Sequence, residues 1–156
     1  MTQAQFPSPV AQRLYDLVND NKTALLTADG QLLYGDQNRI ATTPTLCVES
    51  GPTGRVLAGV GGNGRTENNH TCWLILYYAK VDTNQDTKKE SEQTAEAIAA
   101  YLDQNVRLER SGDGGIVIHG YVSNIEPGYR LRNEGKTLMH AVRLTWTGKS
   151  KTILGA

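Results

Sequence analysis

The densest apolar stretch of this chain runs from Cys72 to Ala79 and reads Cys-Trp-Leu-Ile-Leu-Tyr-Tyr-Ala. It is short, unbroken and rich in aromatic and branched side chains. Such a stretch predicts a strand that is buried on both faces, or on one face with a subunit contact on the other. A polar segment at residues 81–86 separates it from the strongest helical pattern in the sequence.

That helical pattern covers residues 87–105. Small and apolar side chains recur at the spacing of one helix face, and charged side chains occupy the opposite side. Thr87 and Glu90 have the spacing of a capping box, which predicts that the helix starts at Thr87. We expect the apolar side to cover a sheet that includes the Cys72–Ala79 strand. The apolar residues are Ala95, Ile98, Ala99 and Leu102, and the charged ones are Lys88, Lys89, Glu92, Glu96 and Asp103.

A second helix is predicted near the N-terminus, after a loose leader at residues 1–7. Ser8 and Pro9 provide a hydroxyl at the N-cap and a proline at the first helical position. An apolar stripe follows, and Asp29-Gly30 ends the pattern. Residues 31–43 fit either a short strand or an extended crossover. The stripe consists of Val10, Leu14, Leu17 and Val18.

Two short strands and a glycine-rich loop precede the Cys72–Ala79 strand. Residues 45–49 predict a strand that starts after Pro44 and is ended by Ser50-Gly51-Pro52. Residues 55–60 predict the next strand, and the polar residues 61–69 predict a loop. Two strands that flank such a loop predict a long hairpin.

The C-terminal third predicts another hairpin. A turn at residues 111–115 leads into a strand at 116–122, and Glu126-Pro127-Gly128 predicts a turn after it. Residues 131–136 predict a polar tip. The last strand covers 138–147, where alternate residues predict one core face and one wetter face. The core face would carry Leu138, His140, Val142, Leu144 and Trp146, and the wetter face Met139, Ala141, Arg143, Thr145 and Thr147. Residues 148–156 predict a small, basic tail.

Together these elements predict an α+β fold in which two helices cover a mostly antiparallel sheet with long hairpins. The chain has 156 residues and no linker-like segment, so we expect a single domain over residues 1–156. Its formal net charge is +0, so overall electrostatics attracts neither nucleic acid nor an anionic membrane. Cys47 and Cys72 are expected to be buried thiols, and a bridge between them would require adjacent strands.

Two motifs resemble ligand-binding loops, and both are incomplete. Residues 59–66 have the spacing of a phosphate-binding loop, with Arg65 where lysine is required. Because a strand and not a helix is predicted to follow, we expect the end of a hairpin there. Residues 82–86 resemble the start of a calcium loop. Thr87 stands in place of its glycine, and Gln93 in place of its closing glutamate.

The histidines and cysteines show none of the spacings typical of zinc sites. His119 and His140 fall on successive predicted strands. Spacing leaves open a nucleophile pair of Cys72 with either histidine, although the apolar surroundings of Cys72 disfavour a thiolate. We therefore predict no catalytic residues, no metal site and no cofactor. The C-terminal third is basic, which suits an acidic protein partner or nucleic acid, but no aromatic platform is interleaved with the charges.

Four features together carry a resemblance to a known family. They are the opening helix Val10–Leu17, the strand Pro44–Val48, the strand–loop–helix unit ending at Ala95–Leu102, and the final strand Val142–Thr147. In this layout, over about residues 8–148, the chain resembles the tail-terminator (tail-completion) proteins of tailed bacteriophages.

The resemblance implies a structural virion protein and no enzyme. Such subunits form a hexameric ring on the last ring of tail-tube protein, end tube polymerisation and offer a surface to the head-side connector. It implies a place at the virion neck, with the host cytoplasm as the site of assembly, and DNA passing through the lumen without specific binding. Alternatives are a head-closure or neck adaptor, a tube subunit, or, in another class, a nucleotide-binding enzyme using Gly59–Thr66.

By position in the chain, we expect ring or stacking contacts in the glycine-rich loop, the polar tip and the tail. The expected contact residues are Gly62, Asn63, Arg65, Asn68, Arg130, Arg132, Lys149 and Lys151.

Overall fold

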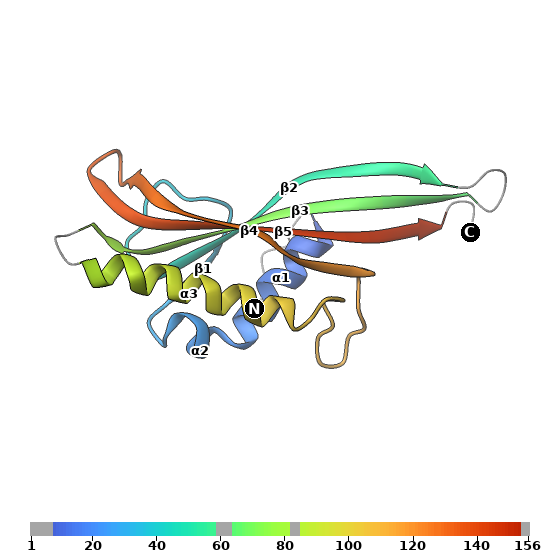
Figure 1. Cartoon of the computed structure of the whole chain (residues 1–156), viewed down its shortest axis with the longest axis horizontal. Helices are drawn as coiled ribbons and strands as arrows, with labels where there is room; N and C mark the ends of the chain where they lie inside the picture. Colours follow the sequence, from blue (N-terminus) through green and yellow to red (C-terminus); the bar gives the residue numbers. More distant parts are fainter. Residues whose placement is uncertain (1–7, 59–63, 82–84, 154–156) are drawn as a thin grey trace.

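The computed structural model describes residues 8–58, 64–81 and 85–153 (Figure 1). In this part of the chain a five-stranded sheet has the order β1-β2-β3-β5-β4, with β1 and β2 parallel and all other neighbours antiparallel. The predicted α+β class with a mostly antiparallel sheet is confirmed. The elements are α1 (Pro9–Asp20), α2 (Lys22–Leu26), β1 (Gln31–Tyr34), β2 (Thr45–Ala58), β3 (Arg65–Lys80), α3 (Gln85–Asp103), β4 (His119–Arg132) and β5 (Thr137–Ile153).

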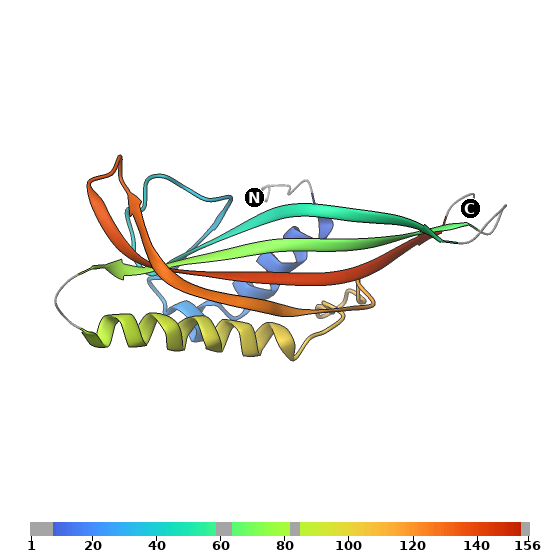
Figure 2. The same ribbon diagram turned by 45° about the horizontal axis from the view of Figure 1, so that its top comes forward.

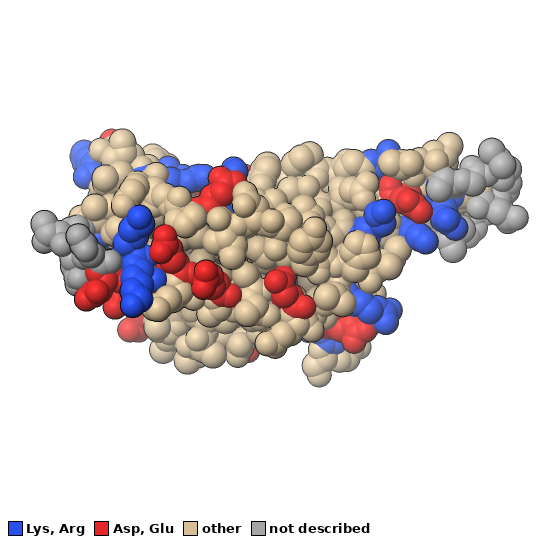
Figure 3. Space-filling view, in the orientation of Figure 1, with Lys and Arg blue, Asp and Glu red and all other residues tan. Residues whose placement is uncertain are grey.

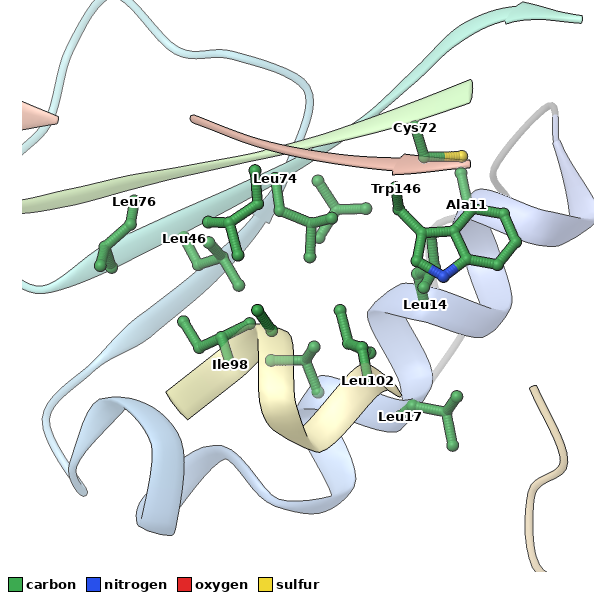
Figure 4. Packing of buried hydrophobic residues seen from close by; sticks show 14 of the residues in the cluster. Ala11, Leu14, Leu17, Leu46, Cys72, Leu74, Leu76, Ile98, Leu102 and Trp146 are labelled. Carbon is green, nitrogen blue, oxygen red and sulfur yellow. The ribbon is translucent and has the colours of Figure 1, made fainter. Parts of the chain in front are cut away.

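The helices pack on one side of the sheet, which we call the helix face; we call the opposite side the far face. Between sheet and helices lies the main core (Figure 4). Apolar side chains from β2, β3 and β5 meet those of α1 and α3 there, so the stripes predicted for both helices are confirmed. The fully buried members include Leu14, Leu46, Leu74, Leu76, Ile98, Leu102, Leu144 and Trp146.

The two long helices differ in how well their starts were predicted. Ser8 caps α1, because its Oγ accepts a hydrogen bond from the backbone N–H of Ala11 at 3.3 Å and Pro9 follows it. The capping box predicted for α3 is wrong, since the helix already begins at Gln85 and Thr87 lies inside it. Glu90 instead accepts a hydrogen bond from the hydroxyl of Tyr78 at 3.1 Å.

β2 is one strand where the sequence predicts two. Ser50, Gly51 and Pro52 form a bulge in it and do not end it. Proline is tolerated here because β1 pairs only with residues 45–48, which leaves β2 as an edge strand beyond that point. Residues 31–34 prove to be a strand, and residues 35–44 cross from β1 to β2.

The β2–β3 hairpin is confirmed, but its strands are longer than expected. Arg65 opens β3 and pairs with Ala58, so residues 65–69 belong to a strand and not to a loop. Residues 61–63 of the predicted loop, and residues 59–60 of the strand predicted before it, lie outside the described residues.

The second hairpin also departs from the prediction. Residues 126–128 do not turn: Pro127 lies opposite Val142 within β4, whose other side has no neighbouring strand in the described chain. The strand starts at His119, later than residue 116, and its turn lies at residues 133–136. Residues 148–153, expected in a tail, continue β5 and pair with residues 65–70 of β3.

The predicted alternation along β5 holds only in part. Val142, Leu144 and Trp146 are buried in the main core as expected. Met139 and Ala141, expected on a wetter face, are also buried, because they join a second cluster on the far face. Leu138, expected in the core, is exposed.

The second cluster is covered by residues 35–44, which we call the strap. Ile40 of the strap packs with Ile75 and Tyr77. Asn133 in the β4–β5 turn fastens it, because its Oδ1 accepts from the N–H of Ile40 at 2.9 Å and its N–H donates to the carbonyl of Asn38 at 2.7 Å. The sequence left an extended crossover open for residues 31–43, but it did not predict that this segment covers a second cluster.

At the other end of the sheet, β2, β3 and β5 run on beyond the helices (Figures 1 and 2). We call this extension the arm; it comprises residues 53–58, 65–70 and 148–153. Among the described helices, none is both long and apolar enough to cross a membrane.

Candidate interaction site: the arm and the strap

The expected contact residues separate into two groups along the sheet. Arg65, Asn68, Lys149 and Lys151 lie together in the arm, whereas Arg130 and Arg132 lie at the opposite end of the sheet. Gly62 and Asn63 fall outside the described residues. The structure therefore brings four of the predicted residues together and places two elsewhere.

The far face of the arm carries an excess of positive charge. Lys151 lies opposite Glu67 and Lys149 opposite Asn69, so with Arg65 three cations share this face with one carboxylate. Arg65 Nη2 and Glu67 Oε1 are 3.8 Å apart and partly exposed, a separation at which an ion pair contributes little. Among the described residues, neither Lys149 nor Lys151 has an ion-pair partner.

Neither hydrophobic cluster includes a described side chain of the arm. Its central strand reads Arg-Thr-Glu-Asn-Asn-His over residues 65–70. On its edge strand, Val56 and Leu57 point to opposite faces and are 53% and 69% exposed. Asn68 is buried within the arm, so its side chain is not part of the exposed surface. Since an isolated polar sheet is marginal in water, the arm depends on its continuity with the core strands.

Both borders of the arm are open sheet edges. Among the described residues, β2 has no outer neighbouring strand beyond Val48, and β4 first pairs with β5 at Lys149. The N–H of Ile118 also donates to the carbonyl of Lys149 at 2.7 Å. Within the described chain, the residues of β5 after Lys149 and of β2 after Thr53 thus present unpaired backbone groups, which favour pairing with another chain.

His70 joins two strands at the base of the arm. Its Nε2 lies 2.7 Å from Ser150 Oγ. Burial lowers the pKa of the imidazole, so the neutral form is favoured. In nucleophilic sites, a serine is activated by a neutral histidine, which a third group orients. Here the described residues place no carboxylate against His70 to take that third role. The pair acts as a cross-strand tie.

At the other end of the sheet, Asp36 in the strap receives three donors. Arg130 Nη1 lies 3.1 Å and Arg132 Nη2 2.5 Å from its Oδ2, and the Tyr77 hydroxyl donates to Oδ1. Burial, and next the bond to Asp36, raise the pKa of Tyr77. The two arginines predicted as contact residues are therefore engaged in holding the strap.

A further cluster, which sequence reasoning missed, fixes residues 105–115 to α1. Arg13 Nη1 donates to the carbonyls of Leu108 and Gly114 at 2.5 and 2.9 Å. Arg110 binds Asp20 through two hydrogen bonds of 2.8 and 2.9 Å, and this contact lowers the pKa of Asp20. A pocket of about 530 Å³ lies beside these residues, but the guanidinium at its border is already paired. These hydrogen bonds join residues that are 90 or more positions apart, so no local sequence pattern predicts them.

The cysteines face opposite sides of the sheet. Cys72 belongs to the main core and Cys47 to the far-face cluster, so adjacent strands do not bring the sulfurs together. Burial raises the pKa of the Cys47 thiol to about 11 and that of Cys72 to about 12. Cys72 pairs across from Trp146 rather than from a histidine, and the described residues contain no group of His, Cys, Asp and Glu suited to a metal.

The structure also shows where the two segments that resemble ligand-binding loops lie. Arg65 begins a strand, so no helix N-terminus follows the glycines as a phosphate loop requires. Residues 82–84 lie outside the described residues, and Asp86 lies exposed in the first turn of α3.

No protein-family model matches this sequence, and no curated protein does either. Among solved structures, a chain of the virion of a native gene transfer agent particle is similar, with a TM-score of 0.47 and 11% sequence identity. The match covers 92% of this chain and 95% of that chain. A similarity this distant carries no argument about function.

Proposed function

We propose that this chain is a structural subunit of a phage-like virion, and that it is the tail terminator, which forms a ring at the top of the tail tube. The observation that carries the proposal is the arm. Three strands leave the helix-covered body, expose Val56 and Leu57, and end in open edges. A monomer gains nothing from such an extension, whereas an assembly can cover it.

Two further observations support the assignment. The four sequence features that carry the resemblance to tail terminators fall on α1, at the start of β2, on β3 with α3, and on β5. The formal net charge of +0 lets copies approach one another without strong overall repulsion. The partners in this proposal are other copies of the chain, the tail-tube protein and the head-side connector, and no cofactor takes part.

Sedimentation velocity and negative-stain imaging of the purified protein, alone and with tube protein, test the proposal. We expect a closed ring, formed by the protein itself or on the end of tubes, and we expect virions assembled without it to have overlong tails. A protein that remains monomeric even when tube protein is present would overturn the proposal.

A tube subunit or a neck adaptor is the second candidate, because open edges on both sides of the arm also suit repeated stacking. The order of assembly separates the candidates. Loss of a tube subunit abolishes tubes, and loss of a head-closure protein leaves filled heads that leak, whereas loss of a terminator lengthens tails.

A further inference from the structure

The net charge of zero conceals a separation of charge between the arm and α3. Acidic side chains lie along α3, while basic ones predominate on the arm (Figure 3). From Glu90 to Asp103 the helix carries carboxylates and no Lys or Arg. The far face of the arm has three cations against one carboxylate.

Two of the acids on α3 are available to a partner. Glu90 accepts from Tyr78 and Asp103 from the N–H of Val122, but Glu92 and Glu96 have no ion-pair partner among the described residues. They are four residues apart, so they lie on the same stripe of the helix and repel each other. Glu96 is exposed and Glu92 half-buried. A cationic partner would relieve this repulsion.

The spacing of the free cations on the arm matches that of these acids. Lys149 and Lys151 are two residues apart on one face of a strand, which separates them by roughly 6.6 Å. Glu92 and Glu96 are four residues apart on a helix, which separates them by roughly 6 Å along its axis. Lys151 is exposed and Lys149 half-buried, and neither side chain forms an ion pair within the described chain.

We propose that the arm of one copy lies along the flank of α3 that carries Glu92 and Glu96 in the next copy, with Lys149 and Lys151 opposite these two carboxylates. This inference rests on the proposed ring and names the contact that builds it. The arm and α3 are different surfaces, so the contact is head-to-tail and repeats until the rotation closes a ring. The pairs are partly exposed, so assembly weakens as salt screens them.

Charge reversal tests the contact directly. One variant carries Lys149→Glu with Lys151→Glu, and the other carries Glu92→Lys with Glu96→Lys. Sedimentation velocity at low salt should show assembly weakened about tenfold or more in each variant alone. Mixing the two variants should restore it, because each reversed surface then meets an opposite charge on its neighbour. Combining all four changes in one chain should restore it as well.

Lys22→Glu with Lys136→Glu makes the same change in net charge as the reversal of Lys149 and Lys151, but outside both surfaces, and should leave assembly unaltered. Restoration by mixing also shows that the reversed variants are folded. A second readout is carbodiimide cross-linking of mixed heavy- and light-isotope copies, which should join Lys149 or Lys151 of one copy to Glu92 or Glu96 of another.

Rings that form equally well from either reversed variant would overturn this contact and leave the proposed ring intact. Reversed variants that fail to recover on mixing would also overturn it. A wild-type chain that assembles neither alone nor with tube protein would overturn the ring and the contact together.

Discussion

The indole of Trp146 occupies the space that a side chain at Gly120 would need. Gly120 in β4 is the register partner of Gly148 in β5, and a Cβ on either glycine would overlap the ring. The largest fully buried side chain among the described residues thus packs against a pair of glycines. Ala11 and Leu14 of α1 lie beside it in the main core (Figure 4).

The first prediction concerns this glycine pair. Gly120→Ala should lower the free energy of unfolding by about 1–3 kcal/mol, because the indole cannot move without displacing the core beneath it. Urea denaturation measures the change. Gly114→Ala is the control, since a Cβ there meets no atom within 4 Å. Equal stabilities of the two variants would show that the core yields easily at Trp146.

The second prediction concerns the strap. Asn133→Gly keeps the left-handed backbone, with φ of 57° in the wild type, and removes the side-chain bonds to Ile40. Because an unbonded N–H of Ile40 is costly, the strap should open more often, and the stability should fall by about 1–3 kcal/mol. A thiol reagent should then label Cys47 faster, because Cys47 lies in the cluster that the strap covers.

Cys72 provides the internal control for that experiment. It is buried on the helix face, away from the strap, so its labelling should follow global unfolding only. Single-cysteine variants, Cys47→Ser and Cys72→Ser, allow each thiol to be followed alone. If the labelling of both thiols accelerates equally in Asn133→Gly, the strap does not open as a separate unit.

The third prediction concerns Asp36. Asp36→Asn leaves two guanidinium groups and the Tyr77 hydroxyl without their shared carboxylate, so the stability should fall by about 1–3 kcal/mol. Thermal unfolding measures the loss. Glu109→Gln removes an exposed ion pair with Arg107 and should change the stability by less than about 1 kcal/mol. A loss at Asp36 as small as that at Glu109 would contradict the role of the carboxylate in fastening the strap.

The fourth prediction concerns pH. Burial lowers the pKa of His70 from 6.5, so between the two pKa values the unfolded chain binds more protons at this residue than the folded one does. The stability therefore falls as the pH decreases through and below about 6.5. His70→Gln should flatten this slope in urea titrations between about pH 5 and 7. His119→Gln, at the exposed start of β4, controls for the removal of a histidine. An unchanged slope in His70→Gln would show that the ring titrates alike in both states.

The sequence predicted the elements whose signal is local. The strand around Leu74 and the helix around Ile98 were correct because an unbroken apolar run and a helical repeat are each visible within a short stretch of sequence. Errors arose where pairing with distant residues overrides local signals. Pro52 and Pro127 are typical of turns in the local sequence. Each nevertheless lies in a strand with a free edge, where the missing N–H of proline costs no hydrogen bond of the sheet.

The candidate site was predicted less completely than the fold. The basic residues of the arm were identified, but their common face depends on the register between β3 and β5, which no local pattern gives. Arg130 and Arg132 were expected at a contact because of their position at the predicted polar tip. Their partner Asp36 is more than ninety residues away in sequence, so its role appears only in the folded chain.

β3 runs without a break from Arg65 in the arm to Lys80 beside α3. A pull applied at the tip therefore meets no joint before it reaches the helix-covered body. Such a load acts along the strand axis and shears the hydrogen bonds to both neighbouring strands at once, since they lie across the direction of pulling. We therefore expect the arm to resist extension along β3 more strongly than bending out of the plane of the sheet.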